Sequence, residues 1–290
     1  MIRRWRRISI LTLLGIGFAL IYRSTLTALV VEWMSSPEAS YGLVLATTTV
    51  VVAVRRWPDF LAQSTAQDRG VAALAGLAVA VLGAALFAVG QLGADLFLTR
   101  ISFVVLLAGA VWSLAGRRAV GTLAAPLAFL LIAIPLPALV VNEVTLPLQL
   151  AASRVAEIVL GLMAIPVYRD GNLLALPSAT LQVAEACSGL RSAVSLGAVG
   201  VLLAWATEST LARRALVVAI TLPIAVFMNG LRVAATGVYT EAVGRAPGAN
   251  LHEFMGWVTF LVAIAALMTL QRLALPRRAP HPSALARAAA

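Results

Sequence analysis

The sequence contains no lysine, a single cysteine and two histidines among its 290 residues. One cysteine excludes an internal disulfide and a cysteine-rich metal site. Charged residues make up only 12% of the chain, whereas 61% of it is hydrophobic. A soluble domain of this length does not carry so little charge, so the composition predicts an all-α polytopic membrane protein.

All 22 basic residues are arginines, and the formal net charge is +10. The arginines occur in short clusters between apolar runs, which is typical of membrane topology signals and not of a nucleic-acid-binding face. We therefore expect no nucleic-acid partner. The clusters predict that both termini and the arginine-rich loops are cytoplasmic, and the only acidic residues in these inner segments are Asp59, Asp68 and Glu208.

Apolar runs between the clusters predict about eight transmembrane helices. The first begins near Ile8, and the others cover residues 41–54, 71–90, 96–115, 121–141, 187–205, 215–233 and 254–270. We expect residues 1–290 to form a single integral membrane domain, with a disordered cytoplasmic tail over 276–290. Pro135 and Pro137 are expected to loosen the outer end of the fifth span.

The longest stretch without a span, residues 142–185, is predicted to lie on the outer side. Its first part, residues 143–162, mixes apolar residues with Gln149, Ser153, Arg154 and Glu157, which predicts a helix in the interface or packed obliquely on the bundle. In its second part, Asp170-Gly171 and Pro177-Ser178 supply turns for a short hairpin. This part also contains Tyr168 and Arg169.

Three polar clusters fall on the outer face in this layout. Cys187 starts the sixth span, Asn229-Gly230-Leu231-Arg232 lies near the outer end of the seventh, and His252 starts the eighth. A cysteine at a helix N-terminus, close to a cation and an imidazole, is favoured as thiolate. Such a group attacks a carbonyl, a histidine moves the proton, and a fixed donor stabilises the oxyanion. Taken singly, each of the three is more often a packing or interface residue.

The motif Glu185-Ala186-Cys187-Ser188-Gly189-Leu190-Arg191-Ser192, with Asn229-Gly230-Leu231-Arg232 and with His252 and Gly256, closely resembles the exosortase/archaeosortase family. The segments Ile134-Pro135-Leu136-Pro137 and Ile165-Pro166-Val167-Tyr168-Arg169-Asp170-Gly171-Asn172 also look like bacterial exosortases. The resemblance covers about residues 124–270. At Ser40-Tyr41-Gly42 the chain departs from the Ser-His-Gly of many exosortases, which puts any role of a histidine there in doubt.

The resemblance implies a membrane-embedded cysteine protease or transpeptidase in the inner membrane of bacteria that often make exopolysaccharide. Its protein substrates would carry a C-terminal sorting signal made of a Pro-Glu-Pro motif (PEP-CTERM type), a transmembrane helix and a basic tail. Cleavage near the motif, by way of a Cys187 thioester, would release or transfer the protein at the outer, periplasmic face.

Roles follow from the resemblance, residue by residue. Cys187 would be the nucleophile, with Arg232 and His252 as the other catalytic residues. The expected supporting residues are Glu185, Ser188, Arg191 and Asn229, and Tyr168 and Arg169 are expected to contact substrate. No cofactor and no metal is implied. Residues 142–185 could form a roof over the site or a groove in which the extended motif pairs as a strand.

A different class of function stays open at this point. A transporter, or a scaffold for polysaccharide export, with a polar outer vestibule would use Arg232 and Glu185 and would need no thiol. Replacing Cys187 by Ala separates the two classes, because transport would survive the change and sorting would not.

Overall fold

The computed structural model describes residues 2–36, 38–64, 71–183, 190–244 and 247–274. Contacts divide the chain into two compact units, Met1–Pro137 and Ala138–Ala290. Each unit is built mainly from helices, which confirms the predicted all-α class.

The first unit consists of helices, and its main feature is the pairing of two of them, α4 and α5. Its elements are α1 (Ile2–Ser35), α2 (Tyr41–Arg55), α3 (Trp57–Gln63), α4 (Val71–Leu92), α5 (Leu96–Ala115), α6 (Arg117–Thr122) and α7 (Ala124–Ala133). Added methyl groups at Gly83 and Gly109 would overlap the backbone of the partner helix, so both glycines permit the close approach of α4 and α5. Asp95 ends the turn between them and caps α5 by accepting a hydrogen bond from the Leu98 N–H at 2.8 Å.

Polar side chains hold α1 against the other helices of the first unit. Arg100 of α5 forms an ion pair with Glu32 in the last turn of α1. The neighbouring Trp33 indole donates a hydrogen bond to the Ala133 carbonyl at 2.9 Å. Nearer the N-terminus of α1, the buried Tyr22 hydroxyl forms a hydrogen bond with the Ser102 hydroxyl at 2.9 Å.

The predicted fifth span, residues 121–141, is wrong as a continuous helix. Helix α7 ends at Ala133, an extended residue follows at Ile134, and the next helix begins at Ala138. The cause is Pro135 and Pro137, which lack N–H donors and keep the preceding residues out of the helical region. With 10 residues, α7 is too short to cross a bilayer alone, because about 20 are needed.

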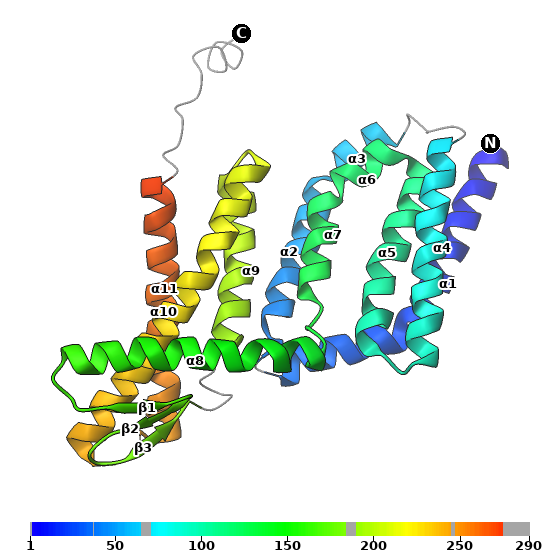
Figure 1. The fold of residues 1–290 in the computed structure, drawn as a ribbon. Helices are drawn as coiled ribbons and strands as arrows, with labels where there is room; N and C mark the ends of the chain where they lie inside the picture. Colours follow the sequence, from blue (N-terminus) through cyan, green and yellow to red (C-terminus); the bar gives the residue numbers. More distant parts are fainter. Residues whose placement is uncertain (1, 37, 65–70, 184–189, 245–246, 275–290) are drawn as a thin grey trace, which may run out of the picture. The chain divides into compact units, whose positions relative to one another are not determined.

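The second unit contains three helices that run side by side and one that lies across them (Figure 1). The three are α9 (Leu190–Thr207), α10 (Leu211–Val243) and α11 (Ala249–Ala274), which correspond to the predicted sixth to eighth spans. Helix α8 (Ala138–Leu162) lies crosswise to them, as expected for an obliquely packed helix.

A small antiparallel sheet lies on the far side of α8 from α9. Its strands β1 (Tyr168–Asp170), β2 (Leu173–Ala175) and β3 (Thr180–Gln182) are joined in sequence order. Both predicted turns are confirmed. Gly171 adopts φ +60 in the first turn, a conformation that glycine adopts without strain, and Pro177-Ser178 lies in the second.

Helix α10 contacts both halves of the second unit. Its first part packs with α9 and α11 in a cluster that includes Leu196, Val217, Met228 and Leu267. Its later part packs with α8 and the sheet in a cluster of Ala156, Leu160, Leu174, Leu176, Val183, Val233 and Ala234. At its C-terminal end, α10 is ten residues longer than the predicted seventh span. These added residues contact the sheet through the apolar cluster and through Glu241.

Helices α8 and α10 touch through a glycine at their crossing. A Cβ added to Gly230 would lie 2.4 Å from Val155 Cβ and 3.1 Å from the Ala152 carbonyl oxygen. One contact is to backbone, so a side chain at residue 230 would push the two helices apart. Two turns further along α10, a Cβ added to Gly237 would lie 3.1 Å from the Leu160 methyl groups.

A buried polar network closes the opposite end of the three-helix bundle. The Glu208 side chain, in the connection from α9 to α10, accepts a hydrogen bond from Gln271 of α11 at 2.9 Å. The Arg214 guanidinium donates to the Glu208 backbone carbonyl at 2.8 Å, and Arg213 lies 3.6 Å from the carboxylate. These bonds tie the last turns of α11 to the α9–α10 connection.

Seven of the described helices, or parts of them, are long and apolar enough to cross a membrane. They cover Gly15–Ser35, Ala73–Leu92, Leu96–Ala115, Ala138–Leu162, Leu190–Thr207, Leu211–Val243 and Asn250–Leu273. Two shorter apolar helices, Tyr41–Arg55 and Ala124–Ala133, complete the set. The seven candidate spans are close to the expected number of about eight.

The crossing of α8 and α10 generates a stability prediction. Gly230→Ala should lower the free energy of unfolding by about 1–3 kcal/mol, because the new methyl group has no space between the helices. Gly197→Ala is the matched control, since nothing lies within 4 Å of a Cβ at that helical position. Thermal unfolding in detergent measures both variants, and a Gly230→Ala protein as stable as the control would contradict the close contact.

Candidate active site

One turn of α10 carries two polar residues next to the crossing with α8. Asn229 is 3% exposed, and its Oδ1 atom is fully buried. Arg232 follows three residues later on a similar face of the helix and is half-buried, with its Nε atom fully buried. A guanidinium and an amide this deep in an apolar bundle are costly to bury, which makes this turn of α10 a candidate functional position.

The Arg232 side chain reaches from α10 to the first turns of α11. Its Nη1 atom lies 3.3 Å from the position of a Cβ on Gly256. His252 precedes Gly256 by one turn on α11, and the Arg232 charge acts on its half-buried imidazole. The structure thus places the Arg232 guanidinium against the turn of α11 that follows His252, where Gly256 leaves space for it.

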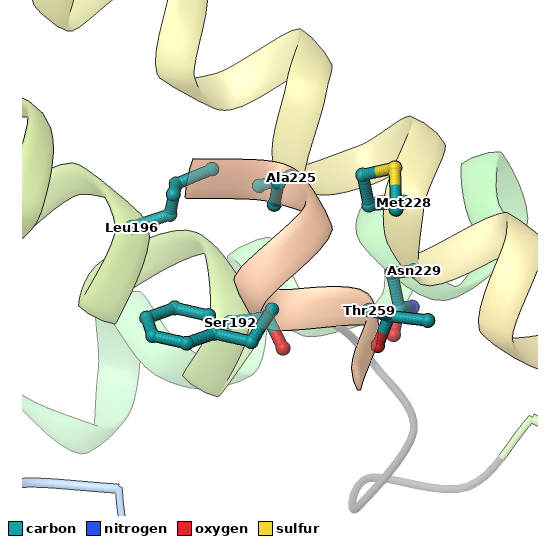
Figure 2. Close-up of a pocket in the computed structure, with 8 residues that line it drawn as sticks. Ser192, Leu196, Ala225, Met228, Asn229 and Thr259 are labelled. Carbon is teal, nitrogen blue, oxygen red and sulfur yellow. The ribbon is translucent and has the colours of Figure 1, made fainter. Parts of the chain in front are cut away.

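A narrow pocket extends from this region between α9, α10 and α11 (Figure 2). It contains about 250 Å³ of empty space, including its open mouth, and is lined by Ser192, Leu196, Ala225, Met228, Asn229, Thr259, Phe260 and Ala263. Three of these residues, one from each helix, carry a hydroxyl or amide group: Ser192, Asn229 and Thr259. The pocket is therefore mainly apolar with a few polar groups, and one of these, Asn229, lies three residues before Arg232 on α10.

The sheet is fastened to α8 and α10 by side-chain bonds. Arg169 of β1 forms an ion pair with Glu157 of α8 at 2.7 Å. Asn172 donates to the Gln149 side chain at 3.1 Å, also on α8. At the other turn, the Ser178 hydroxyl donates to the Glu241 carboxylate of α10 at 2.6 Å.

Some of these contacts could have been expected from the sequence. Gln149, Ser153 and Glu157 are spaced by four residues, so they share one face of α8, and this face is the one that bonds the sheet. Thr259, which lines the pocket, lies seven residues after His252, so both residues lie on a similar face of α11. Glu241 gave no such signal, because its partner Ser178 is 63 residues away in sequence.

The remaining predicted site residues are placed as follows. Glu185, Cys187 and Ser188 lie outside the described residues. Arg191 lies exposed in the first turn of α9, and Tyr168 on β1 is 72% exposed.

Tyr41, which stands where many exosortases have a histidine, is a buried residue of the first unit at the start of α2. Its neighbour Gly42 packs against the Trp33 indole, so this segment has a packing role in its own unit. In the described part of the chain, no group of three His, Asp or Glu side chains is placed to hold a metal ion.

A family comparison identifies the class of this protein. Residues 33–269 match the transmembrane exosortases. The chain belongs to this family, which confirms the resemblance of the cysteine, arginine and histidine motifs. No curated protein and no solved structure matches it.

The family defines what the protein does in general terms. It is a multi-pass membrane protein and a peptidase-like sorting enzyme, which acts on protein substrates with C-terminal sorting signals.

The contact at Gly256 generates a test of the site geometry. Gly256→Val should displace the Arg232 guanidinium, because the added Cβ alone would lie only 3.3 Å from Nη1 and the valine methyl groups narrow the space further. Displacement of a catalytic group by about 1 Å can cost about 100-fold in rate, so we expect sorting of a substrate protein to slow by about 10- to 100-fold. Gly197→Val is the control, and thermal unfolding verifies that both variants fold. Equal processing by the two variants would show that the guanidinium position is unimportant.

Proposed function

We propose that this protein is a cysteine protease or transpeptidase that cleaves a C-terminal sorting signal of the Pro-Glu-Pro type through a thioester on Cys187. Arg232 and His252 are the other catalytic residues, and Asn229, Arg191, Glu185 and Ser188 support them. The proposal depends on one observation above all, which is that the Arg232 side chain of α10 reaches α11 at Gly256, one turn after His252.

The attachment of the cysteine segment supports this proposal. Val183, the last described residue before it, is buried in the same cluster as Val233, the neighbour of Arg232. The first described residue after it is Leu190, which begins α9. Cys187 is four residues from one anchor and three from the other, so the chain can extend no more than about 14 Å and 11 Å from them.

Cys187, Arg232 and His252 supply the nucleophile, the oxyanion donor and the proton carrier that the reaction needs. Neutral His252 takes the proton of the Cys187 thiol, the resulting thiolate attacks the scissile carbonyl carbon, and the carbonyl oxygen becomes an oxyanion that accepts hydrogen bonds from Arg232. As the C–N bond breaks, protonated His252 gives its proton to the leaving amine, and the substrate remains as a thioester. Neutral His252 then takes a proton from water or from an acceptor amine, which attacks the thioester and releases the thiolate.

The arrangement of the second unit suits a substrate with a membrane helix and a basic tail. Arg213 and Arg214 at the start of α10 and Arg272 in the last turn of α11 lie at the end of the bundle opposite the site, and this end is expected to be the cytoplasmic one under the positive-inside rule. A substrate helix lying along the bundle with its basic tail at that end presents its cleavage motif at the periplasmic end. The protein would then act in the inner membrane, with both of its own termini cytoplasmic.

The role of Cys187 can be tested directly. Cys187→Ser should abolish processing, because a hydroxyl near neutral pH is a far poorer nucleophile than a thiolate. Mass spectrometry of the substrate's new C-terminus, with wild-type and variant protein at equal expression, is the measurement. Processing at the wild-type rate by the serine variant would remove the thiol from the mechanism and favour a transporter or scaffold.

Arg232 can be tested for charge and for geometry separately. Arg232→Lys keeps a cation near the site but loses the planar fork of donors, so it should retain thiol reactivity and lose most processing. Removing one oxyanion donor costs about 100- to 1000-fold in rate at comparable sites, and Arg232→Gln should lose both properties. Because Cys187 is the only cysteine, the alkylation rate of the whole protein reports on this thiol alone. Full cleavage by the lysine variant would show that Arg232 acts as a charge or as a structural residue only.

A further inference from the structure

The hydrogen-bond pattern of the small sheet shows which backbone groups of β3 face outward. Val183 donates to the Asn172 carbonyl at 2.9 Å, and Leu176 donates to the Ala179 carbonyl at 2.9 Å. Bonded pairs alternate in an antiparallel ladder, so residues 179, 181 and 183 are bonded to β2. The N–H and C=O groups of the two residues between them, Thr180 and Gln182, therefore point away from the sheet.

This outward edge is open among the described residues. The outward backbone groups of Thr180 and Gln182 bond to no described residue, and both side chains are exposed. The opposite edge of the sheet, formed by β1, lies next to α8 and is joined to it by Arg169 and Glu157 (Figure 1). An open strand edge is a ready template for a further strand, and proteins normally cover one that has no partner.

The β3 edge is also rigidly held. The partly buried Leu181 side chain, between the two outward residues, packs against the apolar cluster that α8, α10 and the sheet share. The β2–β3 turn is fixed to α10 by two bonds from Ser178, its hydroxyl and its N–H, to the Glu241 carboxylate. A peptide that adds to this edge therefore loses conformational entropy, but the β3 strand is already ordered and loses little.

We propose that the edge of β3 at Thr180 and Gln182 binds the extended cleavage segment of the sorting signal as a fourth strand. The inference rests on the proposed function, since it takes its occupant from the substrates of a sorting enzyme. Backbone pairing requires an extended peptide and tolerates varied side chains, as suits an enzyme that processes many proteins. In the sequence, Gln182 lies five residues before Cys187.

A Pro-Glu-Pro segment fits an added edge strand for a physical reason. Successive N–H groups of a strand point in opposite directions, so two prolines separated by one residue both lack N–H groups on the same side. When the glutamate N–H points to β3, the missing donors of both prolines fall on the solvent side, where an edge strand tolerates proline. The prolines then also prevent a fifth strand from adding.

The first test removes the outward N–H of Gln182. Gln182→Pro deletes this donor without affecting the ladder to β2, and Gln182→Ala removes the side chain while retaining the donor. For the full-length protein in nanodiscs, the proline variant should have a kcat/KM about 3- to 10-fold below that of the alanine variant, with the loss in KM. The Cys187 alkylation rate should be equal in both. Equal kcat/KM values, or a loss confined to kcat, would overturn the proposal.

The second test leaves the enzyme's strand unchanged and covers a proline variant that fails to fold. A labelled synthetic sorting signal, with its motif and membrane helix, is bound to Cys187→Ser protein in nanodiscs. N-methylation of the motif glutamate keeps its charge but removes the pairing N–H, and it should weaken binding by about 3- to 10-fold or more. Equal binding of the parent and methylated signals would overturn the proposal.

The two tests separate this inference from the proposed function. Binding to the serine variant needs no catalysis, so it reports on the β3 edge even if Cys187 proves not to be the nucleophile. Conversely, normal thiol-dependent cleavage with no sensitivity to either N–H would refute strand pairing and leave the proposed reaction intact.

Discussion

The second unit depends on the close crossing of α8 over α10 at Gly230. Because no side chain separates the two backbones there, α8 can lie across the bundle directly beside Asn229 and Arg232. The same crossing divides α10 into a part that packs with α9 and α11 and a part that supports the sheet. The candidate site therefore lies where the three-helix bundle meets α8 and the sheet, and a glycine at residue 230 makes this close approach possible.

The bundle is held at both ends by polar groups of different kinds. At one end, Glu208 accepts bonds that connect all three helices, with its carboxylate paired inside the protein. At the other end, Arg232 reaches across to α11 over a glycine. A network of several partners around one buried carboxylate is a structural arrangement, whereas a cation beside an imidazole and a narrow pocket is one suited to chemistry.

Much of this architecture could be predicted from the sequence because long apolar runs specify helices almost without regard to tertiary contacts. The helix at Leu96–Ala115 was predicted to the residue, and the turns at Gly171 and Pro177 followed from local backbone chemistry. The fifth span failed because hydropathy continues through Ile134–Pro137 while the two prolines end the helix. The length of α10 was underestimated because the predicted span ends at residue 233, although the helical turns that follow are stabilised by packing against α8 and the sheet.

The candidate site was predictable only in part. Motifs in three separate segments indicated Arg232 and His252, and their meeting in space required the topology that the arginine pattern supplied. The contacts that fix the sheet were not predictable in full, since Ser178 and Glu241 are distant in sequence and neither belongs to a motif. Periodicity did contain part of the answer, in the four-residue spacing of Gln149, Ser153 and Glu157 on α8.

The length of α10 has a consequence for the environment of the sheet. A helix of 33 residues is about 50 Å long, whereas the hydrocarbon core of a bilayer is about 30 Å thick. If Arg213 and Arg214 in its first turn mark one membrane interface, the last turns of α10, which carry Glu241, extend beyond the hydrocarbon on the other side, and we expect the sheet attached there to be surrounded by headgroups and water. Unbonded backbone groups in hydrocarbon cost several kcal/mol each, so an open strand edge could not exist within the lipid. Outside it, water can satisfy those groups, and a peptide strand of the kind proposed would replace that water.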